Sequence, residues 1–343
     1  MTPAQWDLLR RCATGQAVQP VPVALIVDSP WIPGYLGLSM LDYLTVPEVW
    51  LEANLRVAAE FPEVIFLPGF WAELGMGAEP SAFGCKISLY PNRTPLVHPL
   101  LRAVEQADGL QPPNPHTDGW LPVLLNLYRR MEPRVRDAGH LIKMVAARGP
   151  LTVASHLTGV SEFLLGLKLN PAATHRLLRL TTTLVKQWLQ AQAEALSAVE
   201  GILVLDDLAG FISPRDYLEF GEPYLKEVFD AFPAAIKMFH NDTNNPSCYC
   251  HLPKLGIHLF NFTHQQPLAK VRALVGPEIC LVGNIPPLEV LAQGSPEQVK
   301  ASVRACLEQH PHRKGLILSA GGGTSPGTPA QNIRALVEAA QAG

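Results

Sequence analysis

The sequence predicts an α/β fold: a single (β/α)8 barrel of the TIM type, spanning residues 1–343 as one domain, with an excursion in its N-terminal third. Eight short apolar runs alternate with helix-type stretches along the 343 residues. The runs are apolar nearly throughout, which is typical of parallel strands covered on both faces. The length fits one barrel with insertions. A doubly wound sheet remains an alternative, because the sequence does not show whether the sheet closes.

The eight predicted strands, in chain order, are Val23–Asp28, Val64–Pro68, Lys143–Arg148, Gly201–Asp206, Ile236–His240, His258–Phe262, Ile279–Gly283 and Gly315–Ser319. Asn170 and Pro171 predict the start of a long helix that runs toward Leu205. A short helix is expected over Asn332–Ala342. Residues 71–122 are rich in Gly and Pro and hold a short β-type piece, which predicts an excursion off the barrel, in the form of a hairpin.

Composition excludes several classes of protein. The formal net charge is −3 and the chain has no basic run beyond pairs, so we expect no nucleic-acid partner. No apolar run reaches the ~20 residues that a membrane span needs, and no signal peptide is apparent at the N-terminus. We therefore expect a cytoplasmic protein with a small-molecule substrate. The six cysteines are scattered, which favours free thiols over a disulfide framework.

Polar side chains are expected at the carboxyl ends of the strands, where catalytic groups of such barrels gather. The fourth strand ends in Asp206 and Asp207; neighbouring strand residues face opposite ways, so one carboxylate can reach the mouth while the other anchors a loop or caps a helix. The fifth strand ends in His240-Asn241-Asp242, which suits a metal site, an acid–base pair or only a hydrogen-bonded turn. We predict Asp207, His240 and Asp242 as catalytic. Other strand-end and loop residues are predicted to bind substrate: Tyr35, Arg148, Asp206, Asn241, His264, Asn284, Ser319, Gly321, Gly322 and Gly323.

Two further segments carry candidate chemistry. The glycine-rich run Ser319–Pro329 can offer backbone N–H groups to an anion, although it matches neither the P-loop nor the dinucleotide-binding pattern, and a tight turn without a ligand is the alternative. Cys248-Tyr-Cys250-His251 could be taken for metal ligands. A structural zinc takes four ligands, and no second cysteine pair lies at a useful spacing, so we expect core or surface thiols.

Several motifs in register resemble the uroporphyrinogen decarboxylase superfamily. In the C-terminal third these are Val282–Leu291 (VGNIPPLEVL) and Leu316–Ile333 (LILSAGGGTSPGTPAQNI). In the middle of the chain they are Ile202–Gly210 (ILVLDDLAG) and Ser213–Phe220 (SPRDYLEF). The resemblance covers residues 140–340 well and the first third more loosely. It implies a distorted (β/α)8 barrel, in agreement with the strand count.

The resemblance implies one of two activities. Decarboxylases of the superfamily remove acetate carboxyls from a tetrapyrrole and grip the substrate with arginines after the first strand, where this chain reads Val27-Asp-Ser-Pro-Trp-Ile-Pro-Gly-Tyr. The segment Gly37–Glu48 resembles the methyltransferase branch better. We therefore expect methyl transfer between a small methylated substrate and a thiol or a corrinoid (cobamide), the latter carried on a partner protein. A uroporphyrinogen decarboxylase and a non-catalytic corrinoid- or tetrapyrrole-binding barrel remain the alternatives.

The resemblance also implies a place for a metal. Zinc-dependent members bind the ion through a His-x-Cys after the fifth strand and a Cys in the glycine loop after the eighth. This chain keeps His240 but has Asp242 and Gly322 where the two cysteines would stand. A site of His240 and Asp242 would be a harder ligand set, which favours Mg²⁺, Mn²⁺ or Fe²⁺ as much as zinc. Without a metal, His240 would be the proton donor or acceptor.

Overall fold

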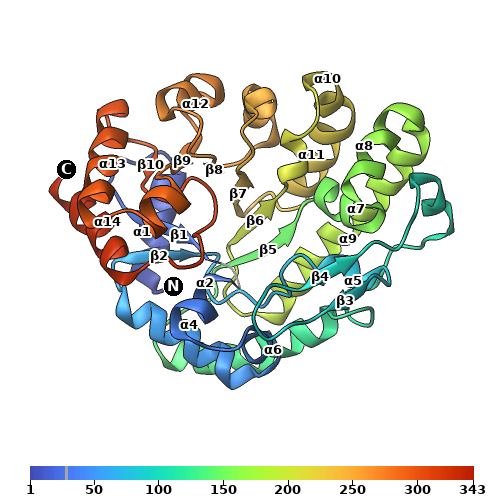
Figure 1. Ribbon diagram of the computed structural model, residues 1–343, viewed down its shortest axis with the longest axis horizontal. Helices are drawn as coiled ribbons and strands as arrows, with labels where there is room; N and C mark the ends of the chain where they lie inside the picture. Colours follow the sequence, from blue (N-terminus) through green and yellow to red (C-terminus); the bar gives the residue numbers. More distant parts are fainter. Residues whose placement is uncertain (28–29) are drawn as a thin grey trace.

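A ring of parallel strands surrounded by helices forms the centre of the computed structural model, which describes residues 1–27 and 30–343 (Figure 1). The ring strands are β1 (Val23–Ile26), β2 (Val64–Leu67), β5 (Met144–Arg148), β6 (Gly201–Leu205), β7 (Ile236–Asn241), β8 (Leu259–Phe262), β9 (Cys280–Val282) and β10 (Leu316–Ile317). Each matches one of the eight predicted runs. The predicted end of the first strand at Asp28 lies outside the described residues.

The strand order confirms a barrel. Strands β5 to β10 pair in sequence order, and β1 pairs with β2, all in parallel. Val23 forms a parallel bridge to Leu318, just after β10, and the backbone N–H of Ala24 donates to Leu318 O at 2.9 Å. The ring therefore continues from β10 to β1. Within the described residues no strand pairing joins β2 to β5.

Helices cover the outside of the ring and supply its connections. The α-helices are α1 (Pro3–Ala13), α2 (Trp31–Leu36), α3 (Met40–Thr45), α4 (Pro47–Glu60), α5 (Ala78–Ala82), α6 (Leu121–Asp137), α7 (Pro150–Thr158), α8 (Val160–Leu169), α9 (Pro171–Ala195), α10 (Pro214–Asp216), α11 (Glu222–Asp230), α12 (Leu268–Val275), α13 (Pro296–Gln309) and α14 (Ala330–Ala342). Short 3-10 and π segments are η1 (Val104–Gly109), η2 (Asp207–Gly210), η3 (Tyr217–Gly221), η4 (Pro246–Leu255) and η5 (Pro287–Ala292). None of the helices in the described residues is long and apolar enough to cross a membrane.

Two sequence-based boundaries need comment. Helix α9 begins at Pro171 with the Asn170 side chain accepting from Ala173 N, as predicted, but it ends at Ala195. The predicted extension toward Leu205 is wrong, because residues 201–205 pair with both neighbours as β6. The predicted excursion is confirmed: β3 (Lys86–Ser88) and β4 (Leu96–His98) form an antiparallel hairpin separate from the ring.

The buried apolar side chains form two layers. One layer lies between the strands and the outer helices, and the other fills the inside of the ring. Helix α1 contributes Trp6, Leu9 and Cys12 to the inner layer, where they join Met144, Leu203 and other inward-facing strand residues in one cluster. The ideal Cβ of Gly201, the first residue of β6, would lie 3.1 Å from the Trp6 ring. Helix α1 therefore closes the end of the barrel at which the strands begin.

The buried carboxylate of Asp206 links β6 to the start of α7. Helix α7 has Gly149 at its N-cap, which provides no side-chain cap, and Pro150 at its first position, which has no N–H. The next two backbone donors are satisfied by Asp206 instead: Leu151 N at 2.9 Å and Thr152 N at 3.0 Å. The Thr152 hydroxyl donates to the same carboxylate at 2.9 Å. Asp206 thus caps a helix that follows a neighbouring strand.

Burial raises the pKa of Asp206 from 3.8 to about 7, and the charge of Asp207 acts in the same direction. The folded chain therefore binds more protons than the unfolded chain between these two values. We expect the free energy of unfolding to fall as the pH rises through this window, by roughly 1–4 kcal/mol from this group. Urea unfolding at several pH values should show this fall reduced in Asp206→Asn and unchanged in Asp137→Asn, an exposed aspartate on α6. Parallel curves for wild type and Asp206→Asn would contradict the prediction.

Candidate active site at the barrel mouth

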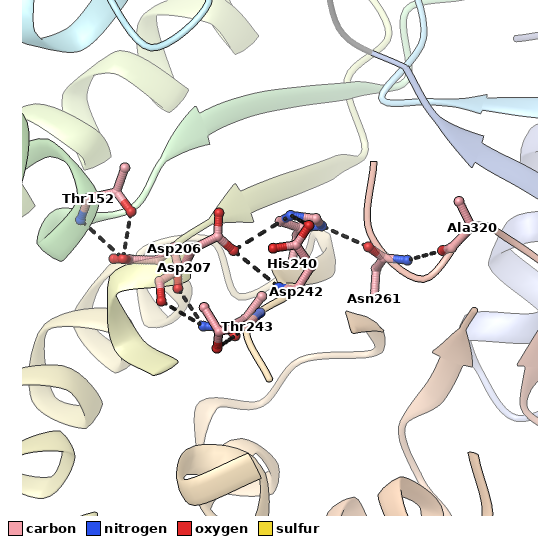
Figure 2. Close-up of polar contacts among 9 residues, drawn as sticks. Thr152, Asp206, Asp207, His240, Asp242, Thr243, Asn261 and Ala320 are labelled. Atoms are coloured by element: carbon pink, nitrogen blue, oxygen red, sulfur yellow. Dashed lines mark hydrogen bonds and ion pairs between the residues drawn. The ribbon is translucent and has the colours of Figure 1, made fainter. Parts of the chain in front are cut away.

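The three side chains predicted as catalytic converge where β6 and β7 end. His240 Nε2 lies 3.7 Å from Asp207 Oδ1 and 4.0 Å from Asp242 Oδ2. One ligand atom from each of the three residues lies within 4.8 Å of the others. Figure 2 shows Asp207 and Asp242 directed at the imidazole, while Asp206 points away toward Thr152. We call Asp207, His240 and Asp242 the mouth triad.

Local hydrogen bonds fix the two loops that carry the carboxylates. The backbone N–H of Asp242 donates to Asp207 Oδ1 at 3.1 Å. The Asn241 side chain donates to Asp206 O at 2.8 Å and accepts from both the backbone and the hydroxyl of Thr243. Asn241 is fully buried and ties the end of β7 to the end of β6. The substrate contact predicted for Asn241 stays a prediction.

Asp242 lies against the glycine loop that follows β10. Gly322 has φ +120°, and a Cβ at this position would lie 2.7 Å from Asp242 Oδ2. Burial raises the pKa of Asp242, and the charge of Asp207 raises it further, while His240 acts in the opposite direction. The loop and the carboxylate therefore share a space that leaves no room for a side chain at position 322.

The second ring nitrogen of His240 is held from β8. His240 Nδ1 lies 2.7 Å from Asn261 Oδ1. The Asn261 side-chain amide donates to Val282 O at 2.7 Å. It also donates to Ala320 O at 3.0 Å, as Figure 2 shows. Both His240 and Asn261 are buried, with exposed fractions of 5% and 0%. The imidazole is thus anchored through Nδ1, and Nε2 is the atom presented to the two carboxylates.

Asp206 and Tyr35, both predicted to bind substrate, form hydrogen bonds within the protein. Both oxygens of Asp206 accept hydrogen bonds from the start of α7, and the residue is 0% exposed. The Tyr35 hydroxyl donates to Glu60 at 2.6 Å, and its ring stacks on Trp31. Sequence position could not separate these residues from the mouth triad, because helix caps and ligand-binding groups both follow strand ends.

Arg148 and Asn284 are also occupied by protein contacts. The Arg148 guanidinium lies over the Trp71 ring at 4.8 Å, with Nη2 at 3.4 Å from Glu73 Oε2. Its side chain is about 4% exposed. The Asn284 amide donates to Gln266 O at 2.8 Å and so holds the loop after β8. Both side chains thus have protein partners in this structure, and their predicted substrate contacts stay predictions.

The remaining predicted positions lie around the glycine loop. A Cβ on Gly321 would lie 2.4 Å from His264 N, so the loop packs directly on the segment after β8. His264 Nε2 is 3.9 Å from Glu289 Oε2. The charge of His264 acts to lower the pKa of Asp242, against the effect of burial. Ser319 is fully buried, and its hydroxyl has no hydrogen-bond partner among the described residues. Gly323 has open space where a Cβ would stand.

Three residues outside the predicted set of site residues also shape this region. Asn261 stands at an inward-facing position of an apolar strand and pairs in register with His240, so strand periodicity could have identified it. Glu73 and Glu79 surround Arg148, and Glu79 accepts from the Arg148 backbone N–H at 2.8 Å. They belong to the excursion after β2, and nothing in their spacing indicates a partner 69 or 75 residues away.

The cysteine cluster, Cys248-Tyr-Cys250-His251, has no hydrogen bond or ion pair to the mouth triad among the described residues. Cys248 is buried and Cys250 is exposed, and both are free. His251 Nδ1 lies 3.2 Å from Glu222 Oε2. Burial raises the pKa of Cys248 to about 12, so this thiol is protonated at neutral pH.

The mouth triad could hold a divalent cation, because one ligand atom from each of its three residues lies within 4.8 Å of the others. One imidazole nitrogen and two carboxylates suit Mn²⁺, Fe²⁺ or Zn²⁺, and carboxylates also suit Mg²⁺. The structure adds Asp207 to His240 and Asp242, the two residues that the sequence offered as metal ligands.

A polar cluster at the carboxyl ends of barrel strands is the place where enzymes of this architecture carry out their chemistry. The model of the family described as uroporphyrinogen decarboxylase (URO-D) matches residues 5–343. The chain belongs to this family, which confirms the resemblance seen in its motifs.

Similar proteins come from both branches of the family. A uroporphyrinogen decarboxylase of Thermus thermophilus is 27% identical, with 98% of this chain and 97% of that protein covered. A methylated-thiol–coenzyme M methyltransferase of Methanosarcina mazei is 25% identical, with 82% and 75% covered. A solved structure of a methyltransferase from Methanosarcina mazei has the same fold, with a TM-score of 0.83 at 23% identity and 98% of both chains covered.

Substitution of Gly322 by alanine is expected to displace Asp242 and disrupt the mouth triad. The added Cβ would lie 2.7 Å from Asp242 Oδ2, at a φ that side chains rarely adopt. Gly323→Ala is the matched control, because nothing lies within 4 Å of its Cβ. Mn²⁺ titration should show affinity weakened by roughly 10-fold or more in Gly322→Ala only. Equal affinities in the two variants would contradict the close approach of loop and carboxylate.

Proposed function

We propose that this chain is a methyltransferase of the URO-D superfamily. It would move a methyl group between a small methylated substrate and a thiol or a corrinoid, the latter a cobamide carried on a partner protein. The observation that carries the proposal is the mouth triad with the glycine loop packed against it. His240, Asp242 and Gly322 stand at the positions that the resemblance gives to metal ligands in zinc-dependent members, and Asp207 lies beside them. The methyltransferase relative from Methanosarcina mazei supports the same branch.

Each residue of the mouth triad has its own role in the proposed reaction. Asp207 and Asp242 provide negative charge beside His240 Nε2, and this arrangement holds a cation or a protonated group of the substrate. A divalent cation, when bound by these three residues, would supply the positive charge that converts a thiol to the more nucleophilic thiolate. His240 Nε2 otherwise accepts the thiol proton itself. The glycine loop brings backbone close to Asp242 and borders the space above it.

Uroporphyrinogen decarboxylation is the second candidate, favoured by the Thermus thermophilus relative that covers nearly the whole chain. Its substrate carries eight carboxylates, which need cationic partners. Residues 12–55 contain neither Arg nor Lys, and this stretch includes the segment after β1. Arg148, at the end of β5, already pairs with Glu73. The charge at the mouth therefore favours methyl transfer.

Activity assays separate the candidates. Anaerobic incubation with methylcobalamin and a small thiol should form the S-methyl product and consume methylcobalamin. Reduced uroporphyrinogen should remain unchanged under the same conditions. His240→Ala should lower turnover by roughly 100-fold or more, because it removes the proposed base. The circular dichroism spectrum should stay native, because the helices and strands of the barrel do not depend on this one side chain. Steady accumulation of coproporphyrinogen would overturn the proposal, and binding of methylcobalamin without turnover would favour a non-catalytic barrel.

Metal content distinguishes the mouth triad from the cysteine cluster. Protein purified without chelator should bind one divalent cation, and Asp242→Ala should lose it, since a ligand is removed. Cys250→Ser is the control, because this thiol is exposed and lies on η4. Stoichiometric zinc that persists in Asp242→Ala but disappears in Cys248→Ser or Cys250→Ser would place the metal at the wrong cluster for this proposal. An unfolded His240→Ala protein would assign the histidine a structural role.

A further inference from the structure

The side chain of Asn261 connects four neighbouring strands beneath the mouth triad. It stands on β8, contacts His240 on β7, and donates to the backbone of Val282 on β9 and of Ala320 just after β10. Asn261 is 0% exposed, so each of its polar atoms must find a partner within the protein. Figure 2 shows the contacts in one line from Ala320 through Asn261 to the imidazole.

These contacts fix which way the amide faces. Val282 O and Ala320 O can only accept hydrogen bonds, so the group facing them must be the NH2 of Asn261. In the flipped orientation, the amide oxygen would stand against two carbonyl oxygens in a buried site. The amide oxygen of Asn261 therefore faces His240.

The orientation of the amide in turn fixes the imidazole. An amide oxygen accepts and cannot donate, so His240 Nδ1, at 2.7 Å, must carry the hydrogen. In the neutral ring, the lone pair then belongs to Nε2, which lies between Asp207 and Asp242 at 3.7 and 4.0 Å. Three electron-pair donors thus face one another across a small space.

We propose that Asn261 is a positioning residue that holds neutral His240 as the Nδ1–H tautomer, so that Nε2 is the atom that binds the cation or accepts the substrate proton. The role of this tautomer in catalysis rests on the proposed function, whereas the tautomer itself can be observed in the protein without metal or substrate. A carbonyl-type oxygen bonded to the remote nitrogen is how histidine ligands are generally oriented and made more basic. Here the oxygen belongs to a neutral side chain that is itself locked by two backbone carbonyls.

The chain contains a matched control for the loss of such bonds. Asn332 on α14 is also 0% exposed, and its amide donates to Leu291 O at 2.9 Å and Gly294 O at 2.8 Å. Its oxygen has no hydrogen-bond partner among the described residues. Asn332→Leu therefore removes two buried side-chain-to-backbone bonds, as Asn261→Leu does, without removing an acceptor from a histidine.

Nitrogen NMR of protein with ¹⁵N-labelled histidine tests the inference without metal or substrate. Spectra are recorded about two units above the usual histidine pKa, and the His240 signals are assigned by their absence in His240→Ala. The wild type and Asn332→Leu should show the proton on Nδ1. Asn261→Leu should lose this preference, because leucine offers no oxygen that accepts from Nδ1. A wild-type spectrum with the proton on Nε2 would overturn the inference, as would an unchanged tautomer in Asn261→Leu.

Mn²⁺ affinity provides a second readout. Asn261→Leu should bind Mn²⁺ about 10–100-fold more weakly than wild type, and Asn332→Leu should bind it as wild type does. Equal losses in the two variants would reduce Asn261 to a packing residue and overturn the inference. A wild type that binds no Mn²⁺ would count against the metal-dependent form of the proposed function, while the tautomer in the NMR spectrum would still decide the role of Asn261.

Discussion

Successive side chains of a strand point to opposite faces, and this constraint organises the whole mouth of the barrel. Asp206 and Asp207 are neighbours in sequence, yet one caps α7 in the outer layer while the other faces His240 across the opening. The same alternation sends Asn241 outward to tie two loops together and His240 inward. Residues that hold the loops together, Asp206 and Asn241, thus alternate along the chain with residues of the mouth triad. The contacts between the two loops depend on the register of β6 with β7.

Asp242 and Gly322 act as a pair. The resemblance places a cysteine at each of these positions in zinc-dependent members of the superfamily. In this chain the carboxylate occupies the space that a side chain at position 322 would need. The two replacements are therefore mutually consistent, because the carboxylate of Asp242, just after β7, leaves no room for a Cβ at position 322 on the facing loop. Both loops are thus adjusted to each other at this point.

The order of elements and the place of the site could be predicted because they depend on local signals. Near-continuous apolar runs identified all eight ring strands, and polar residues after them located Asp207, His240 and Asp242, which the structure brings together. Contacts whose partners lie far along the chain could not be predicted. Nothing local indicates that Glu73 and Trp71, from the excursion, surround Arg148. In the same way, no local pattern shows that Tyr35 donates to Glu60 or that Asn284 donates to Gln266 O.

The position of α1 determines from which end of the barrel a small molecule can reach the mouth triad. Trp6, Leu9 and Cys12 fill the end where the strands begin, and Trp6 is fastened there by a 2.7 Å bond from its indole nitrogen to Glu200. In the described part of the chain, the inside of the ring is thus closed by apolar side chains where the strands begin, and the mouth triad lies where the strands end. A small molecule can therefore approach His240 only from the carboxyl ends of the strands.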